Sequence, residues 1–219
     1  MNYNLLAPVY DLLSDAYTGG GIRYSKLGHQ QHIQPGERVL YAGAGTGHEC
    51  VRLAARGARV TVLDQSPKML KICRRRLNAA GLEAVVVEAE LFSFMQKRAA
   101  LGDAANFDVV VAPYFLNVFS AAQLPVALQA LVHLLRPGGR MISVDFRAPS
   151  SSRVFSWLQR LYYFPPLLLF YTLAHNPWHE LYDYRRVVED SRLPLRLTTN
   201  LVHPAWGFPL LETLIWTKL

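Results

Sequence analysis

The fold is decided by residues 39–47, which read VLYAGAGTG. An apolar run opens this stretch, and three glycines, Gly43, Gly45 and Gly47, close it at every second position. Because glycine has no side chain, the backbone can turn tightly there and a ligand can approach it closely. The turn leads into the N-terminus of a helix expected over residues 48–56, where free backbone N–H groups can meet a ligand. The stretch therefore predicts a buried strand, a ligand-binding turn and a helix.

Short apolar runs and helical segments keep alternating after this turn. We expect strands over residues 38–42, 59–63, 83–87, 108–112 and 140–145. Helices are expected between them, one beginning at Ser66-Pro67 and one over residues 124–135 that ends at Arg136-Pro137-Gly138-Gly139. Proline cannot continue a helix, and glycine accepts the left-handed cap. Continuous apolar strands that alternate with helices predict an α/β fold, with a doubly wound, Rossmann-like sheet over residues 37–147.

Composition narrows the class of protein. Hydrophobic residues make up 51% of the 219 residues and charged residues 18%, which excludes a disordered chain. The net charge of +7 favours anionic neighbours, but the cations are mixed with aliphatic residues and no binding motif appears, so nucleic acid is not expected. Two cysteines are too few for a disulfide framework, which favours a cytoplasmic location, and the first residues lack the features of a signal peptide.

The spacing of the glycines discriminates between cofactors. Dinucleotide-binding turns have the pattern G-x-G-x-x-G/A, but here the last position is His48 or Cys50. The turn also lacks the Lys-Ser/Thr pair of a nucleotide P-loop. A ligand without a pyrophosphate, such as S-adenosylmethionine (SAM), suits it. Asp64 closes the second strand, where its carboxylate can accept hydrogen bonds from both ribose hydroxyls of an adenosine.

Further cofactor contacts are expected along the ends of the next strands. Met69, in the helix that starts at Ser66-Pro67, is placed to pack on the adenosine. Glu88 ends the third strand and is expected at the adenine amino group, with Glu90 as its rival. The complete predicted cofactor-binding set is Gly43, Gly45, Gly47, Asp64, Gln65, Met69, Glu88, Ala89 and Pro113.

The segments VLYAGAGTG, VTVLDQSPKML, VVVEAEL, FDVVVAP and LLRPGGRMISVDF, in this order, resemble the class I SAM-dependent methyltransferases. The leader sequence YDLLSD, followed by Gly19-Gly20-Gly21, and the sequence DFRAP after the fifth strand are similar to the ubiquinone/menaquinone-biosynthesis C-methyltransferase group. This resemblance implies a SAM cofactor and a small aromatic, quinone-like or lipidic substrate. It also implies one domain, with a helical leader or lid (1–36), the SAM-binding core (37–147), and a substrate-covering insert with the last strands (148–219).

Two features depart from this family: the residue at position 41, and the C-terminal sequence HPAWGFPLLETLIWTKL, since the quinone group has a longer and more regular one. Tyr41 stands where the family usually places an acid that helps to hold the amino-acid end of the cofactor, and tyrosine carries no charge at neutral pH. Glu49, at the start of the next helix, is a candidate to compensate. Another SAM-dependent group transfer, such as amino transfer to a quinone, and a non-catalytic SAM- or lipid-binding accessory protein are therefore kept as alternatives.

Residues 150–184 are rich in aromatic side chains. Such a segment suits the binding of a flat apolar substrate, or an interfacial helix that meets an anionic membrane surface through its arginines. It also suits a cover for the edge of the sheet. The most apolar part, residues 161–174, is too short to span a bilayer, and Pro165-Pro166 is expected to interrupt a helix there.

No single catalytic residue stands out. The candidates for a base or an orienting group are Tyr10, Tyr24, Tyr114 and His175. His175 and His179 are four residues apart, but Pro177 between them argues against a regular helix, so a metal site is not expected. The oligomeric state is left open.

Overall fold

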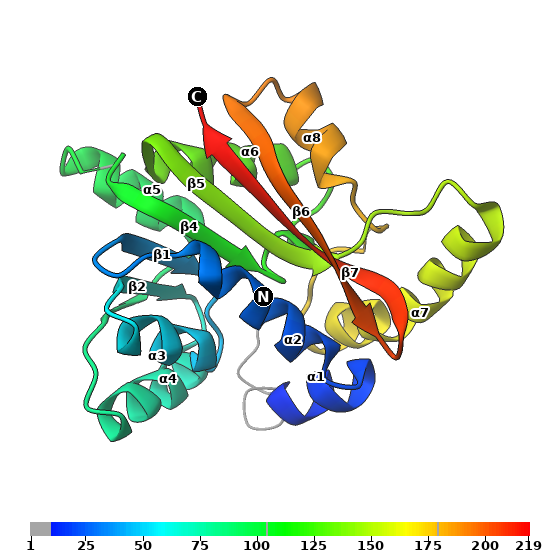
Figure 1. The fold of residues 1–219 in the computed structure, drawn as a ribbon, viewed down its shortest axis with the longest axis horizontal. Helices are drawn as coiled ribbons and strands as arrows, with labels where there is room; N and C mark the ends of the chain where they lie inside the picture. The colour runs from blue at the N-terminus through cyan, green and yellow to red at the C-terminus, as the bar shows by residue number, and fades with distance from the viewer. Residues whose placement is uncertain (1–9, 104, 179) are drawn as a thin grey trace.

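The structure, a computed structural model, describes residues 10–103, 105–178 and 180–219. Its centre is a seven-stranded sheet in the order β3-β2-β1-β4-β5-β7-β6 (Figure 1). Strands β1 to β5 run parallel, and β7 and β6 add two antiparallel strands at one side. The strands are β1 (Arg38–Ala42), β2 (Arg59–Asp64), β3 (Val85–Glu88), β4 (Phe107–Pro113), β5 (Leu135–Phe146), β6 (Leu195–Ala205) and β7 (Phe208–Lys218).

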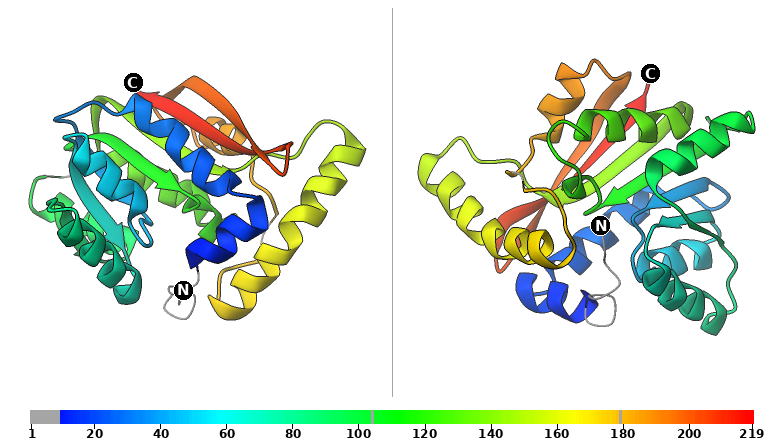
Figure 2. Two further views of the ribbon diagram at one scale, coloured as in Figure 1. Left: turned by 60° about the horizontal axis from the view of Figure 1, so that its bottom comes forward. Right: turned by 180° about the vertical axis from the view of Figure 1, so that it is seen from behind.

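Helices cover both faces of this sheet (Figure 2), which confirms the predicted doubly wound α/β fold. Alternate residues of one strand serve the two faces, because side chains in a strand point to opposite sides. Val39 and Tyr41 of β1 pack with the helices α3 and α4, whereas Leu40 and Ala42 pack with α5 and α6. The helices are α1 (Tyr10–Thr18), α2 (Gly21–Gly28), α3 (His48–Ala55), α4 (Pro67–Ala79), α5 (Leu91–Ala100), α6 (Leu124–Leu134), α7 (Arg153–Leu173) and α8 (Tyr184–Asp190), with short 3-10 turns at His29–His32 and Leu116–Val118.

The predicted elements of the core agree with the structure to within two residues at most boundaries. Strand β1 has the bounds predicted for it, and α4 begins as predicted, with the Ser66 hydroxyl accepting a hydrogen bond from the Met69 N–H. The expected stop at residues 136–139 is wrong in detail. Helix α6 ends at Leu134, and these residues belong to β5, in which Leu135 pairs with Phe107. Arg140 is the next residue of β5 that pairs with β4, and the register shifts between these two pairs, so residues 136–139 form an irregular start of the strand and not a helix cap.

The expected interruption at Pro165-Pro166 is also wrong, because α7 continues through both prolines. A proline in a helix removes the donor to the carbonyl four residues earlier. For Pro166 that carbonyl belongs to Tyr162, and it accepts a hydrogen bond from the Tyr17 hydroxyl of α1 instead. The Tyr162 hydroxyl in turn donates to the Tyr17 carbonyl at 3.2 Å. This exchange satisfies the helix and joins α7 to the leader.

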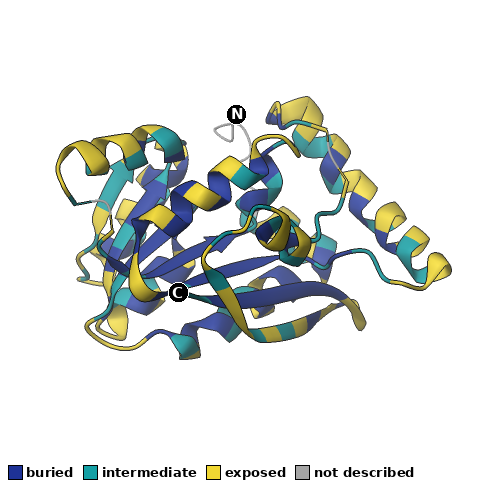
Figure 3. Ribbon diagram, turned by 90° about the horizontal axis from the view of Figure 1, so that it is seen from above, coloured by how far each residue is buried: buried dark blue, intermediate teal, exposed yellow. Residues whose placement is uncertain are grey.

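Burial is uneven across the molecule (Figure 3). Strands β1 and β4 are almost wholly buried, as is β5 from Met141 to Phe146, and both cysteines, which lie in α3 and α4, are buried too. Helix α7 shows exposed bands along most of its length, and it packs on the rest of the chain through a small cluster that includes Tyr163 and Leu167. Among the described residues, no helix is both long enough and apolar enough to cross a bilayer.

Candidate functional site

The three glycines of the turn between β1 and α3 all have positive φ, at +66°, +54° and +76°. They differ in what surrounds them. A Cβ added at Gly43 would lie 2.5 Å from Phe115 Cδ2, and one at Gly47 would lie 2.2 Å from Cys73 Sγ. At Gly45 an added Cβ would meet nothing within 4 Å. Gly43 and Gly47 are therefore required by packing, whereas Gly45 faces open space.

Asp64, at the end of β2, lies directly beside this turn. One carboxylate oxygen accepts a hydrogen bond from the Gly45 N–H and the other from the Ser66 N–H, both at 2.8 Å. Burial raises the pKa of Asp64, although these hydrogen bonds oppose the shift. A carboxylate has about four acceptor positions. Three are used here, by the N–H groups of Gly45, Ser66 and Gln65, so Asp64 can still accept a hydrogen bond from a hydroxyl group of a ligand.

A cavity of about 420 Å³ begins at this turn and extends to α7. Seven of the predicted cofactor residues line it: Gly43, Gly45, Asp64, Gln65, Met69, Ala89 and Pro113. Gly47 is not among the lining residues. Glu88 is exposed and does not line the cavity either, whereas its rival Glu90 does. Glu88 is the last residue of β3 and pairs there with Asp64. The residues that line the cavity, Ala89 and Glu90, come directly after the strand.

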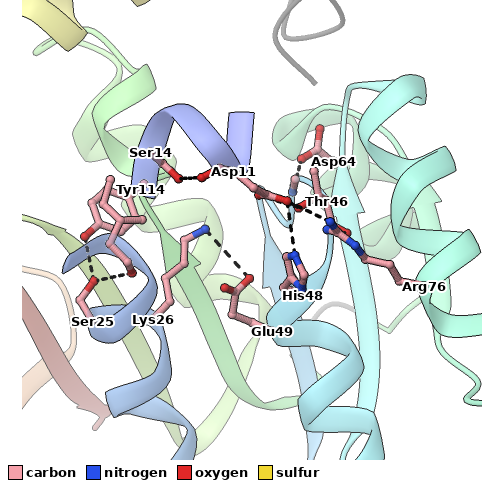
Figure 4. A network of polar contacts seen from close by, with 12 residues as sticks. Asp11, Ser14, Ser25, Lys26, Thr46, His48, Glu49, Asp64, Arg76 and Tyr114 are labelled. Atoms are coloured by element: carbon pink, nitrogen blue, oxygen red, sulfur yellow. Dashed lines mark hydrogen bonds and ion pairs between the residues drawn. The ribbon is translucent and has the colours of Figure 1, made fainter. Parts of the chain in front are cut away.

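The leader lies over the glycine turn (Figure 4), and sequence reasoning missed its role there. Asp11 of α1 accepts hydrogen bonds from the Thr46 hydroxyl at 2.9 Å and from Arg76 at 3.0 Å, and His48 Nε2 lies 3.4 Å away. Burial opposes ionisation of Asp11, but the hydrogen bonds from Arg76 and Thr46 outweigh it and lower its pKa. A single carboxylate therefore joins α1, the turn and α4.

Of the four catalytic candidates, Tyr114 is the one that lines the cavity. It has a positive φ of +51°, and its hydroxyl lies 2.8 Å from the Ser25 hydroxyl of α2. Strained backbone of this kind is concentrated at functional sites. Tyr24 is 62% exposed, and neither Tyr24 nor the exposed His175 lines the cavity. The side chain of Tyr10 and all of His179 lie outside the described residues.

Sequence reasoning also missed a cluster of three hydrogen-bonded polar residues at the cavity wall, Asn117, Asp145 and Tyr184. Asn117 lines the cavity and donates to buried Asp145 at 2.9 Å, while the Tyr184 hydroxyl donates to the other Asp145 oxygen at 2.7 Å. Burial raises the pKa of Asp145 to about 7. Among the described residues, no group of three His, Cys, Asp or Glu side chains is arranged to hold a metal ion.

Comparison with known proteins identifies the family. The model of the methyltransferase domain matches residues 39–139. A demethylmenaquinone methyltransferase of Thermus thermophilus is 31% identical over 165 residues, which are 74% of this chain and 71% of the relative. The chain is a class I SAM-dependent methyltransferase. It is also 28% identical to the ubiquinone/menaquinone biosynthesis C-methyltransferase of Pseudomonas paraeruginosa, over 87% of this chain and 73% of that protein.

Solved structures agree with this methyltransferase in fold. The magnesium protoporphyrin IX methyltransferase of Synechocystis, determined with bound S-adenosylhomocysteine (SAH), has a TM-score of 0.62. It is 18% identical and is matched over 90% of this chain and 82% of that one. The N-methyltransferase NodS of Bradyrhizobium japonicum, also with SAH, has a TM-score of 0.61 at 15% identity, over 90% of this chain and 85% of that one.

The geometry of this methyltransferase fits its cofactor. The open space at Gly45 leaves the turn accessible to a ligand, and the adjoining Asp64 carboxylate keeps a free acceptor position for a ribose hydroxyl. When bound, SAM supplies an activated methyl group. The residues of the chain then have to position the acceptor and exclude water around it.

Proposed function

We propose that this methyltransferase acts on the ring of a quinol-type aromatic substrate that carries an apolar tail. The observation that carries the proposal is the wall of the cavity beyond the glycine turn. Among the apolar residues that line it are seven aromatic side chains, namely Tyr17, Tyr114, Phe115, Phe119, Phe146, Tyr163 and Phe170. Flat rings pack well between such side chains in tilted or edge-to-face arrangements. Two relatives are named for methylation in the synthesis of ubiquinone or menaquinone, which supports the same substrate class.

Tyr114 is the residue we propose to orient the acceptor ring. Its ring lies edge-to-face with Phe146 at 5.8 Å, and its hydroxyl is held by Ser25. A fixed phenol at the wall can hydrogen-bond a hydroxyl of the substrate and set which ring atom faces the methyl donor. Asn117, held by Asp145, supplies a second fixed polar group on the same wall.

The substrate proposal is tested by incubating the protein with SAM and three acceptors: a hydroquinone with an isoprenoid tail, the same ring without its tail, and a simple phenol. We expect the tailed hydroquinone to gain one methyl group, detected by mass spectrometry, with an equal amount of SAH released. The tailless ring should react more slowly. Binding of SAM without methylation of any of the three would overturn the proposal, and a product mass that indicates amino transfer would assign a different chemistry.

We also infer that the protein contacts an anionic membrane surface through the outer face of α7. Exposed apolar side chains form a stripe at helical spacing along this face: Trp157, Leu161, Phe164, Leu168 and Tyr171, which are 43–62% exposed. Arg160 lies beside the stripe and is 53% exposed, although it pairs with Glu180 at 3.2 Å. An apolar stripe with arginines and no capacity to span is typical of a helix that lies in the membrane interface.

Phe170 belongs to the cavity wall, so the membrane contact is best tested on the stripe alone. Trp157, Leu161 and Leu168 are replaced together by Ser, with Val126→Ser on α6, also exposed at 53%, as the control. With vesicles that contain phosphatidylglycerol, the wild type should bind reversibly and less at high salt, because screening weakens the arginine contribution. The triple variant should bind about tenfold or more weakly. A wild type that stays in the supernatant at low salt would exclude this contact.

A further inference from the structure

Lys26 of α2 lies on the cavity wall near the glycine turn. It is the one positively charged residue among the described residues that line this cavity. The acidic residues of the lining are Asp11, Asp64 and Glu90. A negatively charged group of a ligand would be repelled by these carboxylates and attracted to Lys26.

The side chain of Lys26 is only 14% exposed, and its ammonium is poorly paired (Figure 4). Its contacts with described residues are Glu49 Oε2 at 4.0 Å and the ring of Tyr114, whose centre lies 5.9 Å away. An ammonium has three N–H donors, and a distance of 4.0 Å is too long for a hydrogen bond. Burial of a charge is costly unless the charge is paired and hydrogen-bonded. The site is therefore built to receive an acceptor from a ligand.

Two residues near Lys26, Glu49 and Tyr41, determine the charge at this end of the cavity. Glu49 is in the first turn of α3, directly after the glycine turn, and its side chain is only 10% exposed. Tyr41 is completely buried at the end of β1, and its hydroxyl has no hydrogen-bond partner among the described residues. Burial raises the pKa of Tyr41 further above its ordinary value, so it stays neutral. Tyr41 thus supplies no charge at this end of the cavity, and the Lys26–Glu49 pair does.

We propose that Lys26 binds the carboxylate of the methionyl group of SAM, and that Glu49 holds the Lys26 ammonium at the glycine turn. SAM carries one carboxylate, and the cavity wall carries one matching cation. Through this contact, Lys26 would let the protein recognise the carboxylate at the amino-acid end of the cofactor. The proposal depends on the cofactor and is independent of the substrate proposed above.

The test compares SAM with decarboxylated SAM, which keeps the adenosine, the sulfonium and the amine but lacks the carboxylate. Binding is measured by calorimetry for the wild type, for Lys26→Met and for Lys71→Met, an exposed lysine on α4 that serves as the control. We expect Lys26→Met to weaken SAM binding about tenfold or more and to leave decarboxylated SAM within about threefold. Lys71→Met should bind both ligands as the wild type does.

Equal loss of both ligands in Lys26→Met, with the fold intact by circular dichroism, would show a general effect on the cavity and overturn the proposal. So would unchanged affinity for SAM. If Lys26→Met does not fold, Lys26→Arg and Lys26→Gln replace it: the arginine should keep the preference for SAM, and the glutamine should lose it. No methyl acceptor is present in these measurements, so their outcome is separate from the identity of the substrate.

Discussion

The two ends of the cavity have different walls. At the glycine turn the wall is formed by backbone that hydrogen bonds and close packing hold in place. At α7 it is formed by apolar side chains of a helix whose opposite face is also apolar, and exposed. Gly45 and Asp64 are locked together at 2.8 Å, and Gly43 and Gly47 have neighbours that leave no room for a Cβ. Helix α7 is held by side chains instead: buried Gln159 donates to the Ala148 carbonyl and accepts from the Ser150 N–H, and Tyr162 exchanges hydrogen bonds with Tyr17 of the leader. From this contrast we infer that the cofactor end is the more rigid of the two, and that the α7 end accommodates the apolar substrate proposed above.

Gly47→Ala is expected to have the largest effect, and it tests the close packing at the glycine turn. The added Cβ would lie 2.2 Å from Cys73 Sγ at a φ of +76°, so α3 and α4 would have to separate. We expect a loss of about 3 kcal/mol or more in the free energy of unfolding, measured by chemical denaturation. Gly81→Ala is the control, because its φ is +64° but nothing lies within 4 Å of the added atom. It should cost about 1–2 kcal/mol, and equal losses would show that packing at Gly47 is not decisive.

The rigidity of the core is also why its elements could be predicted from the sequence. Strand β1 is predicted to the residue, since an apolar run with a glycine turn behind it has few other structures available. Residues 136–139 could not be placed in β5, because Leu135 and Arg140 on either side of them are held by Phe107 and Val109 of β4, which lie far away in the sequence. Local turn chemistry alone favours a helix stop there.

A position on the cavity wall was predictable where a residue ends a strand of the parallel sheet, as Asp64 and Pro113 do. It was not predictable where the leader returns over the turn. Nothing in the sequence around Asp11 or Lys26 indicates that these residues reach Thr46 and Glu49. Glu88 and Glu90 could not be separated either, because the choice depends on where β3 ends. Continuation of α7 through Pro166 required a hydrogen bond from Tyr17, which is more than 140 residues away.

Asp64→Ala tests the cofactor end next. The change removes a charged acceptor, and it also frees the Gly45 and Ser66 N–H groups. We expect SAH to bind about 1.5–3 kcal/mol more weakly, by calorimetry on the folded variant. Glu88→Ala, in an exposed side chain outside the cavity, is the matched control and should bind SAH as the wild type does. Unchanged affinity in Asp64→Ala would refute the ribose assignment.

Asp145 lines neither end of the cavity, but it holds Asn117 on the cavity wall, and its titration provides a further test. Its pKa rises from an ordinary value of 3.8 to about 7, so between these values the folded chain keeps a proton that the unfolded chain has released. Stability should therefore fall as pH rises from about 4 to 7. Asp145→Asn imitates the protonated acid, so we expect it to lie within about 0.5 kcal/mol of the wild type at pH 4 and to exceed it by about 4 kcal/mol at pH 8. Burial also raises the pKa of Glu212, so a residual slope should persist in the variant.

Parallel curves for the two proteins across this range would mean that Asp145 is ionised in the folded state at pH 5. The hydrogen bonds from Asn117, Tyr184 and the Phe146 N–H would then outweigh its burial. Thermal denaturation at several pH values, with the same ionic strength throughout, separates these outcomes.

The smallest effect is expected at the outer face of α7, with Leu161→Ser. This side chain is 55% exposed and contributes little to packing, so the free energy of unfolding should change by less than about 0.5 kcal/mol and SAH affinity should not change. Leu167→Ala, on the same helix but only 8% exposed and facing the cavity, should cost about 2–3 kcal/mol, because it leaves a void against Tyr163 and its neighbours. Chemical denaturation of the two variants compares the two faces of α7 directly.

A loss of 2 kcal/mol in Leu161→Ser would mean that the outer stripe is covered by protein in solution, since a lone exposed leucine cannot contribute that much. The stripe would then be unavailable to a membrane, and the accommodation of an apolar ligand assigned to α7 would belong to its inner face alone.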